Sequence, residues 1–583
     1  MIIFQPANIT HFNKEQETVM ESAQAAGVFL ENICGGNGTC GKCKVKVIIG
    51  ECNPVTEAEK KYLTEEEISQ GYRLACKLVP KMAFRTCEIL VEEQSEETIA
   101  PRIEAMLEKE QLQKELREIE KAVGVENIRK YGGKVNKNVD SSLISHKEQW
   151  IDKRKYGIAL DIGTTNIEML LWDMESGTCL GRKISSNKQR SYGADVVSRI
   201  AYAVQSEENF QKLCEVLQKQ IRKMMSELLR KQLERINEKN QEAEEISQDW
   251  NEKIEKMVVV GNAAMMHFFA GEKVDTLAKA PYTSTYKKSR ILEGKIFALP
   301  NARIYLAPNI EGFVGADTVG VMTYLSDKEK LDHSLMIDIG TNGEIALVKG
   351  NICYVASTAA GPAFEGASIS CGMRGEAGAI RGMTIREKIS LDVIGAIEPK
   401  GICGSGLIEI VAKLYSAGVI DKTGYLCSQE VALQKGCPKV VADCIEDGEN
   451  GNVFVLYRSK KNEVRLTQKD IRELQLAKAA ILAGVETMLE ECGMNMEEIQ
   501  TCYLAGAFGK HLNAECAKGI GLLPDIESSR IVTVGNAALF GACQMLLEET
   551  KWDMGKAIAE KAVHISLSEK ESFKGKYLKG IEF

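Results

Sequence analysis

The chain has 583 residues, of which 44% are hydrophobic and 27% charged, with 50 Gly and 11 Pro. This composition excludes a disordered or fibrous protein, and the length exceeds what one hydrophobic core supports, so we expect two to four domains. The 74 Lys and Arg against 82 Asp and Glu leave a net charge of −8, which disfavours nucleic acid and anionic membranes as partners.

The sequence contains no signal for a membrane. No apolar run reaches the length of a membrane span, and the opening residues MIIFQPANITHFNKEQ lack the charged and apolar regions of a signal peptide. We therefore expect a cytoplasmic protein with no membrane partner. In a reducing compartment the 18 Cys are not expected to form disulfides, and a tight group among them indicates metal.

Residues 1–94 form the first expected domain and hold six of the 18 Cys. Three Cys share a Gly-rich loop with the spacing C-x5-C-x2-C, and a fourth follows after 32 residues. Glycines let the backbone approach and offer N–H groups to sulfides, so such a loop can wrap a small inorganic core. Zinc prefers two paired C-x2-C units, and only one is present. The expected ligands of such an inorganic centre are Cys34, Cys40, Cys43 and Cys76.

The same pattern resembles the plant-type and adrenodoxin-like [2Fe–2S] ferredoxins, which implies a [2Fe–2S] cluster. Cys52 and Cys87 fall outside the spacing, and we expect them to be structural thiols. Residues 95–155 follow, where IEAMLEKEQLQKELREIEKAV has apolar residues at helical spacing among many Glu and Lys. This region is expected to be a solvated helical linker or a reduced middle domain.

From Tyr156 onward the chain alternates apolar strands, Gly-rich turns and helices, which is typical of an α/β protein. One internal repeat stands out: GIALDIGTTNIE at Gly157–Glu168 and LMIDIGTNGEIA at Leu335–Ala346. Each reads as a strand, an Asp-Ile-Gly-Thr turn and a second strand. Such a hairpin offers backbone N–H and hydroxyl donors to phosphate, and its Asp can hold hydrated Mg²⁺ or orient water. Two copies predict two similar lobes, at 156–334 and 335–583.

These features resemble the superfamily of acetate and sugar kinases, heat-shock chaperones and actin (ASKHA). The two turns resemble its phosphate motifs, and CYLAGAFG at Cys502–Gly509 resembles its adenosine motif. Gly261–Ala264 and Gly535–Ala538 resemble its two connecting helices. The expected fold is therefore multidomain α/β and α+β: an N-terminal β-grasp ferredoxin-like domain, a helical linker and a two-lobed ASKHA ATPase with actin- or hexokinase-like, ribonuclease H-like lobes.

A ferredoxin-like domain ahead of an ASKHA ATPase resembles the reductive activators of corrinoid proteins. Three further segments resemble sequences of that family, at Asn187–Ile200, Ala359–Met373 and Gly401–Glu409. The resemblance implies an ATP-hydrolysing enzyme that passes an electron from its [2Fe–2S] cluster to an inactive Co(II) corrinoid protein and restores Co(I) for methyl transfer. It also implies a corrinoid partner (a methyltransferase component or a corrinoid iron–sulfur protein), an upstream low-potential electron donor, a homodimer and an anaerobic host.

Roles for individual residues follow motif by motif. The expected catalytic residues, which manage Mg²⁺ and the attacking water, are Asp161, Asp338 and Glu344. The expected ATP-binding residues are Gly163, Thr164 and Thr165 in one lobe and Gly340, Thr341, Asn342, Gly343, Gly506, Ala507, Phe508 and Gly509 in the other.

Three other functions remain open at this point. The first is an ASKHA small-molecule kinase gated by the redox state of the cluster, and the second is an ATP-driven clamp that senses redox state without electron transfer. The third is an activator of 2-hydroxyacyl-CoA dehydratases, which shares the ATPase lobes but places a [4Fe–4S] cluster between subunits. The four-Cys loop argues against this third alternative.

Overall fold

The computed structural model describes residues 1–6, 8–28, 30–32, 34–81, 86–91, 103–125, 155–239, 250–328, 331–366, 368–460, 462–506 and 512–583. The chain divides into two compact units. The first comprises Met1–Met257, Ala264–Thr285 and Leu292–Ile304, and the second comprises Val258–Ala263, Tyr286–Ile291 and Tyr305–Phe583. Among the described residues, no helix has the length and apolar character needed to cross a membrane.

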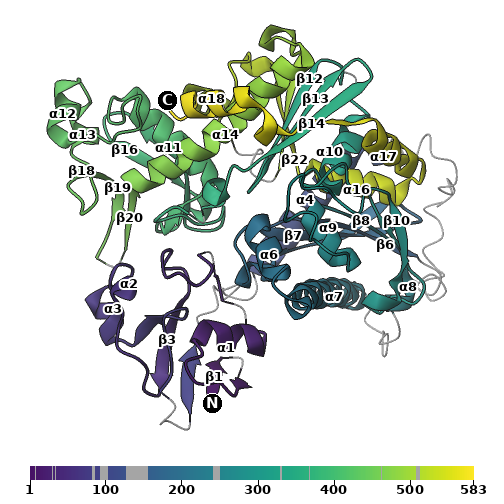
Figure 1. Ribbon diagram of the computed structural model, residues 1–583, viewed down its shortest axis with the longest axis horizontal. Coiled ribbons are helices and arrows are strands. Elements are labelled where there is room, and N and C mark those ends of the chain that lie inside the picture. The colour runs from purple at the N-terminus through teal and green to yellow at the C-terminus, as the bar shows by residue number, and fades with distance from the viewer. Residues whose placement is uncertain are drawn as a thin grey trace. The chain divides into compact units, whose positions relative to one another are not determined.

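The N-terminal part is a five-stranded sheet in the order β2-β1-β5-β3-β4, drawn in purple in Figure 1. β1 pairs parallel with β5, and the other neighbours pair antiparallel. Alternate residues of β1 and β5, including Ile2, Phe4 and Ile89, point into one small core, as a half-buried strand requires. The elements are β1 (Ile2–Gln5), β2 (Ile9–His11), α1 (Val19–Ala26), β3 (Lys44–Ile49), α2 (Glu57–Lys60), α3 (Glu65–Ser69), β4 (Tyr72–Leu74) and β5 (Cys87–Leu90).

The helical pattern after this sheet forms α4 (Ile103–Val123). Its side chains Leu116, Ile119 and Val123 are buried, and α4 packs on β8 (Thr178–Ser186), the edge strand of the next sheet. The Glu120 carboxylate accepts a hydrogen bond of 2.8 Å from the backbone N–H of Cys179. The helix therefore covers a sheet edge, where it protects unpaired strand groups. The rest of the predicted linker, residues 126–154, lies outside the described residues.

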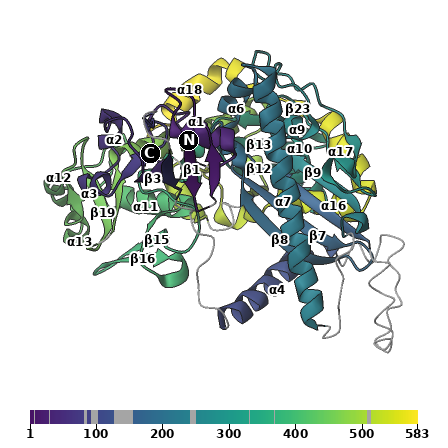
Figure 2. The same cartoon turned by 90° about the horizontal axis from the view of Figure 1, so that it is seen from below.

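The next sheet has the order β10-β11-β9-β6-β7-β8. Its β6 and β7 form the first predicted hairpin, and the long helix α7 packs on β7 and β8 (Figure 2). The boundary between the two units crosses β9, β10 and β11. The elements are β6 (Tyr156–Ile162), β7 (Asn166–Asp173), α6 (Val196–Ala203), α7 (Glu207–Lys239), α8 (Trp250–Lys253), β9 (Ile254–Gly261), α9 (Ala263–Ala270), β10 (Arg290–Glu293) and β11 (Arg303–Leu306).

The main sheet of the second unit has the order β22-β21-β12-β13-β14-β23. β12, β21 and β22 are parallel, while β12, β13 and β14 form an antiparallel meander. β12 and β13 are the second predicted hairpin. The elements are α10 (Ala316–Leu325), β12 (Ser334–Ile339), β13 (Gly343–Lys349), β14 (Ile352–Thr358), α14 (Gln468–Cys492), β21 (Thr501–Ala505), β22 (Ile531–Gly535), α16 (Ala537–Leu547), α17 (Thr550–Lys561), β23 (Val563–His564) and α18 (Glu571–Lys579).

Two small sheets, β16-β15-β17 and β18-β19-β20, complete the second unit. They share one large core with the main sheet, α11 and α14, to which Ile337, Ile408 and Ile481 contribute. The elements are β15 (Ala379–Ile385), β16 (Ile389–Val393), β17 (Gly401–Ile402), α11 (Gly404–Ser416), α12 (Gln429–Gln434), α13 (Lys439–Ala442), β18 (Ile445–Glu446), β19 (Val453–Arg458), β20 (Glu463–Thr467) and α15 (Ala514–Gly519).

Candidate cluster and nucleotide sites

The four predicted ligand thiols contact one another in the structure. The Sγ atoms of Cys43 and Cys76 are 3.3 Å apart, and the thiol of Cys34 makes hydrogen bonds with those of Cys40 and Cys76. These bonds lower the pKa of Cys34, while the pKa values of Cys40 and Cys76 are raised by their bonds to Cys34. The hydrogen bond to Cys76 also lowers the pKa of Cys43. Four cysteine sulfurs in mutual contact are a donor set suited to iron.

Glycines shape the loop around these thiols. Gly35, Gly36, Gly38 and Gly41 all have positive φ, so the backbone curls around the sulfurs in a way that larger residues resist. The hydroxyl of Tyr62 donates to the carbonyl of Thr39 and holds the loop from outside. No three His, Cys, Asp or Glu side chains in the described ranges are arranged to hold a metal ion. The assignment of a cluster therefore rests on the Cys spacing, the thiol contacts and the domain match given below.

The first hairpin ends in a tight turn whose backbone carbonyls accept hydrogen bonds from buried side chains. The N–H of Gly163 donates to the carbonyl of Asn166 at 2.9 Å and closes the turn. The side chain of Asn187 donates to the Gly163 carbonyl at 2.9 Å, and Arg199 donates to the Thr164 carbonyl at 2.6 Å. Asn187 and Arg199 are fully buried. The predicted turn residues Gly163, Thr164 and Thr165 are therefore brought together on a rigid support.

The segment that contains Asn187 and Arg199 also contacts the chain just before the predicted cluster loop. It continues through the one-turn helix η1 (Lys188–Ser191). The Ser191 carbonyl accepts from Asn32 at 3.3 Å and from Gln24, and the Ser191 hydroxyl donates to the Leu30 carbonyl at 3.0 Å. Asn32 lies two residues before the predicted ligand Cys34. The segment from Asn187 to Arg199 thus contacts both the first phosphate turn and the chain leading into the cluster loop.

The second hairpin has the same closure, with the N–H of Gly340 donating to the carbonyl of Asn342 at 3.1 Å. The Thr341 carbonyl accepts from the N–H of Gly361 at 2.8 Å, and the Thr341 hydroxyl donates to Glu365 at 2.8 Å. Gly361 and Glu365 belong to AAGPAFEGASISCGM, the segment at Ala359–Met373. This segment therefore supports the second turn, much as the 187–199 segment supports the first.

Strand register brings three of the predicted residues of the second lobe together at one end of neighbouring strands. Asp338, near the end of β12, faces Glu344 on β13 and Ala505 on β21. Gly506 follows with φ of +88°, and a Cβ placed on it would stand 2.6 Å from Asp338 Oδ1. A glycine is therefore required for the adenosine motif to pass the carboxylate so closely. The other predicted adenosine residues, Ala507, Phe508 and Gly509, lie outside the described residues.

A third carboxylate, not anticipated from the sequence, joins Asp338 and Glu344. Asp317 lies in the first turn of α10, and its Oδ1 accepts from the N–H of Thr318 at 2.8 Å. Burial and then the charge of Asp317 raise the pKa of Asp338 to about 7. Burial also raises the pKa of Asp317 to about 6 and, together with both neighbours, that of Glu344 well above its ordinary value. The only signal in the sequence was the Gly-Ala-Asp triplet before an apolar helix, a common helix start.

The two hairpins differ in how their acidic residues are compensated. In the first, Asp161 faces Glu168 across the strands, and Glu168 pairs with Arg182 at 2.6 Å. In the second, burial is the largest cause of the raised pKa values of Asp317, Asp338 and Glu344, and neighbouring carboxylates add to it for Asp338 and Glu344. Burial and mutual repulsion of this kind favour protonation of one or more of these carboxylates.

Close helix packing places Asp317. A Cβ on Gly541 of α16 would stand 1.9 Å from the carbonyl oxygen of Gly320 on α10, so the two helix backbones touch. A Cβ on Gly315, just before α10, would stand 2.4 Å from the backbone nitrogen of Ala263. The predicted connecting segment around Asn262 thus contacts the start of α10, and the one around Asn536 leads into α16, which packs on α10.

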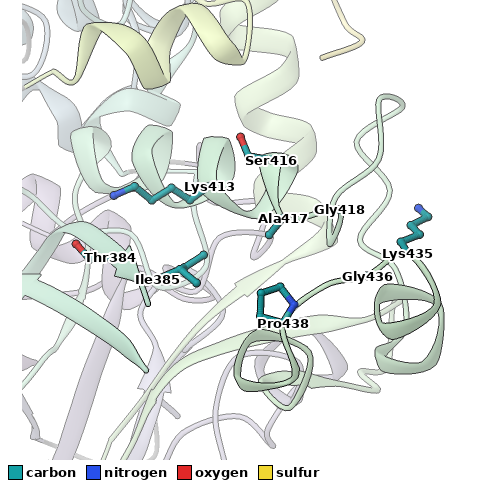
Figure 3. A pocket seen from close by; sticks show the side chains of 9 residues that line it. All are labelled: Thr384, Ile385, Lys413, Ser416, Ala417, Gly418, Lys435, Gly436 and Pro438. Atoms are coloured by element: carbon teal, nitrogen blue, oxygen red, sulfur yellow. The ribbon is translucent and has the colours of Figure 1, made fainter. Parts of the chain in front are cut away.

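The second unit also contains a cavity away from these carboxylates (Figure 3). It has a volume of about 590 Å³, and none of the predicted nucleotide residues lines it. Lys413 of α11 projects beside it, but its ammonium group already pairs with Glu409 at 2.5 Å. The lining residues are Thr384, Ile385, Lys413, Ser416, Ala417, Gly418, Lys435, Gly436 and Pro438.

Three family descriptions match the chain. They are "2Fe-2S iron-sulfur cluster binding domain" at residues 4–81, "RACo middle region" at 156–329, and "C-terminal domain of RACo the ASKHA domain" at 332–583. A solved structure described as a reductive activator for corrinoid, iron–sulfur protein matches with a TM-score of 0.64 and 29% identity, over 100% of this chain and 98% of that one.

Two curated relatives match most of the chain. The corrinoid activation enzyme RamQ of Eubacterium limosum is 35% identical over 456 residues, which is 77% of this chain and 73% of the relative. A Co(II) methylated amine-specific corrinoid protein reductase of Methanosarcina barkeri is 27% identical over 460 residues, 73% of this chain and 76% of the relative.

A 2Fe-2S domain joined to an ASKHA domain defines an iron–sulfur protein of the ASKHA superfamily, whose cofactors are a [2Fe–2S] cluster and ATP. The long match to RamQ goes further: the chain belongs to the family of corrinoid activation enzymes. The expected fold class, a ferredoxin-like domain followed by a two-lobed ASKHA domain, is confirmed. The residue roles and the domain boundaries assigned from the sequence stay predictions.

Proposed function

We propose that this protein is an ATP-dependent reductive activator that passes an electron from its [2Fe–2S] cluster to a Co(II) corrinoid protein and restores Co(I) for methyl transfer. The observation that carries the proposal is the union, in one chain, of the four-thiol loop and the ASKHA lobes, with 35% identity to a corrinoid activation enzyme. Neither part alone distinguishes this function from an ordinary ferredoxin or an ordinary kinase.

The energetics explain why such a chain combines the two parts. Plant-type [2Fe–2S] clusters have potentials near roughly −400 mV, and a Co(II) corrinoid is harder to reduce. An uphill gap of about 100 mV costs roughly 2.3 kcal/mol for one electron. A protein that binds the corrinoid partner with different affinities in its nucleotide states can offset that cost. ATP turnover would then separate the partners after the electron has moved.

Cys34, Cys40, Cys43 and Cys76 would hold the cluster, which supplies one electron when reduced. The thiol contacts and the four positive-φ glycines of the loop support this assignment. Cys43 and Cys76 are almost wholly buried, so that side of the cluster is shielded from water. Cys34 and Cys40 are partly exposed and mark the side from which an electron would leave.

ATP phosphates would bind the two turns, at Gly163–Thr165 and Gly340–Gly343. Asp338 would hold hydrated Mg²⁺ or orient the attacking water, and Glu344 is the alternative for either task. Burial and the charge of Asp317 raise the pKa values of both carboxyl groups. Asp161 would assist from the first hairpin. Gly506, with Ala507, Phe508 and Gly509, would flank the adenosine.

The partners follow from the same proposal. The chain would receive electrons from a low-potential donor, act as a homodimer and work in the cytoplasm of an anaerobe. The net charge of −8 supports a protein partner and not nucleic acid.

The deciding experiment mixes anaerobic, pre-reduced protein with a Co(II) corrinoid methyltransferase component, with and without ATP, and records visible spectra. Growth of the Co(I) band only with ATP is the expected result. Cys76→Ser should abolish it, because the cluster loses a ligand, whereas Cys437→Ser should not. Cys437 is buried in the other unit, where its thiol contacts the carbonyl of Pro438.

Other outcomes would point elsewhere. No Co(I) with several corrinoid partners, despite an intact [2Fe–2S] spectrum, would contradict the proposal. ATP consumption that rises with a small-molecule substrate would then favour the redox-gated kinase. ATP binding with little turnover would favour the clamp.

A further inference from the structure

Two Cys outside the ligand set meet in the ferredoxin-like sheet. The Sγ atoms of Cys52 and Cys87 are 4.0 Å apart, although the residues are 35 positions apart in the chain. Cys87 begins β5, and Cys52 forms an isolated bridge with Pro80. The chain passes directly over Cys87 at Gly50, where an added Cβ would stand 3.0 Å from Cys87 Sγ. The sequence analysis expects both to be structural thiols, and their spacing in the chain gives no sign of this contact.

The two thiols are not equivalent. Cys87 is buried, with 3% of its surface exposed, whereas Cys52 is half-buried. The hydrogen bond from Cys87, and then the charge of Arg73, hold the pKa of Cys52 below its ordinary value, while the pKa of Cys87 is raised. Thiolates are the reactive form in disulfide exchange. Cys52 is placed to attack first and Cys87 to resolve.

Asn53, next to Cys52, makes hydrogen bonds with the segment that follows Cys76, the fourth predicted cluster ligand. Its side-chain oxygen accepts from the N–H of Val79 at 2.7 Å, and its amide donates to the carbonyl of Lys77 at 2.9 Å. Its own N–H donates to the Val79 carbonyl at 2.9 Å. Lys77 directly follows Cys76, a predicted ligand. A movement of Cys52 by about 2 Å, which closing a disulfide from this distance requires, would therefore act on the Cys76 segment.

We propose that Cys52 and Cys87 form a redox-active dithiol that low-molecular-weight disulfides convert into an intramolecular disulfide, and that Asn53 passes this change to the Cys76 segment. In the first step the Cys52 sulfur attacks glutathione disulfide, forming a mixed disulfide and releasing one glutathione thiol. In the second step the Cys87 sulfur attacks the Cys52 sulfur and releases the other. Two protein thiols are oxidised, one glutathione disulfide is reduced, and both protons leave with glutathione.

The test treats anaerobic holoprotein with excess glutathione disulfide and maps its peptides without reduction. The unaltered protein should yield a Cys52–Cys87 linked peptide pair. Cys87→Ser should stop at a glutathione adduct on Cys52, because the resolving thiol is gone. Cys437→Ser is the matched control and should form the disulfide as the unaltered protein does.

The second readout is the cluster itself. Disulfide formation should change the visible circular dichroism and the midpoint potential of the cluster, and Asn53→Ala should weaken that change while the linked peptides still form. The proposal is overturned by a glutathione adduct that persists in the unaltered protein, by the absence of any reaction at Cys52, or by a disulfide that leaves both cluster signals unchanged. Each readout is independent of corrinoid reduction, so its failure is distinguishable from a failure of the proposed function.

Discussion

Asp338 shows how burial alters the chemistry of an ordinary residue. A surface Asp is ionised at neutral pH, and a neighbouring charge in water changes its pKa little. Asp338 is buried, and burial together with the charge of Asp317 raises its pKa to about 7. A carboxylate in this state exchanges its proton for a divalent cation near neutral pH. In the first hairpin, by contrast, Arg182 pairs with Glu168 at 2.6 Å.

Asp338→Asn should therefore lower ATP turnover by about 100-fold or more, the scale of losing one well-placed electrostatic group. The visible spectrum of the cluster should be unchanged. Asp332→Asn is the matched control, since Asp332 is an exposed carboxylate on the approach to the same strand. Steady-state phosphate release measures the effect. Turnover that survives in Asp338→Asn would show the phosphate assignment to be wrong.

The raised pKa also predicts a pH dependence. Between about pH 4 and 7 the folded protein holds protons on Asp338 that the unfolded chain, with an ordinary pKa of 3.8, releases. This contribution to stability is present below the ordinary pKa and is lost as the pH rises through the folded value. Without divalent cations, the melting temperature of the unaltered protein relative to Asp338→Asn should therefore fall between about pH 5 and 8.

Mg²⁺ with ATP should restore the lost stability at the upper end of this range, because the cation replaces the protons. Differential scanning calorimetry in a chelator, and then with Mg²⁺ and ATP, measures both effects. A difference between the two proteins that is flat with pH would mean that Asp338 titrates normally.

At the scale of elements, contacts between backbones position the predicted catalytic side chains. α10 carries Asp317, and it touches α16 where Gly541 meets Gly320. α4 covers the edge strand β8, and the 187–199 segment spans the distance from the first phosphate turn to the chain before Cys34. α16 and the 187–199 segment contain none of the predicted catalytic residues, but they contact the elements that carry Asp317 and the first turn.

Gly541→Ala should separate α10 from α16, because the new methyl group would collide with the Gly320 carbonyl. The cost expected for such overpacking is about 1–3 kcal/mol. ATP turnover should fall, since Asp317 moves with α10, and the cluster spectrum should not change. Gly575→Ala in α18 is the control, as a Cβ there meets nothing within 4 Å. Equal stability of the two variants would contradict the packing argument.

Ser191→Ala should weaken communication between the nucleotide turn and the cluster loop. The substitution removes the hydroxyl that donates to Leu30, whereas Asn187 and Arg199 still support the turn. In hydrogen-exchange experiments, ATP should protect residues 187–199 in both proteins but should protect the 30–43 region less in Ser191→Ala. Equal protection of the 30–43 region in both would show that Ser191 plays no part in this communication.

At the scale of the whole molecule, the ferredoxin-like sheet and the second ASKHA lobe each have a hydrophobic core of their own. Separate cores mean that one part can lose its cofactor without unfolding the other. The proposed function, however, needs both parts in one chain.

Cys76→Ser should therefore lose the cluster absorbance while keeping an ATP-dependent rise in melting temperature. The measurement is thermal unfolding with and without Mg²⁺ and ATP, followed by circular dichroism, with Cys437→Ser as control. Loss of the nucleotide effect in Cys76→Ser alone would mean that the two parts fold as one cooperative unit.

The sequence by itself determined the features that depend on local spacing. Cys34, Cys40 and Cys43 lie on one short loop, so chain connectivity alone keeps them together. Each Asp-Ile-Gly-Thr turn joins its own two strands, so Asp338 and Glu344 must face each other across the hairpin. The order of these motifs along the chain was enough to indicate a ferredoxin-like domain joined to an ASKHA domain.

Only the tertiary structure decided which distant residues meet. Asp317 joins Asp338 because α10 packs on α16 through backbone contacts that no periodicity reveals. Cys52 meets Cys87 because the order of strands in the sheet brings β5 beside β3, with the chain passing over at Gly50. Packing between elements far apart in sequence depends on shape and burial summed over many side chains, whereas spacing within a loop depends on the loop alone.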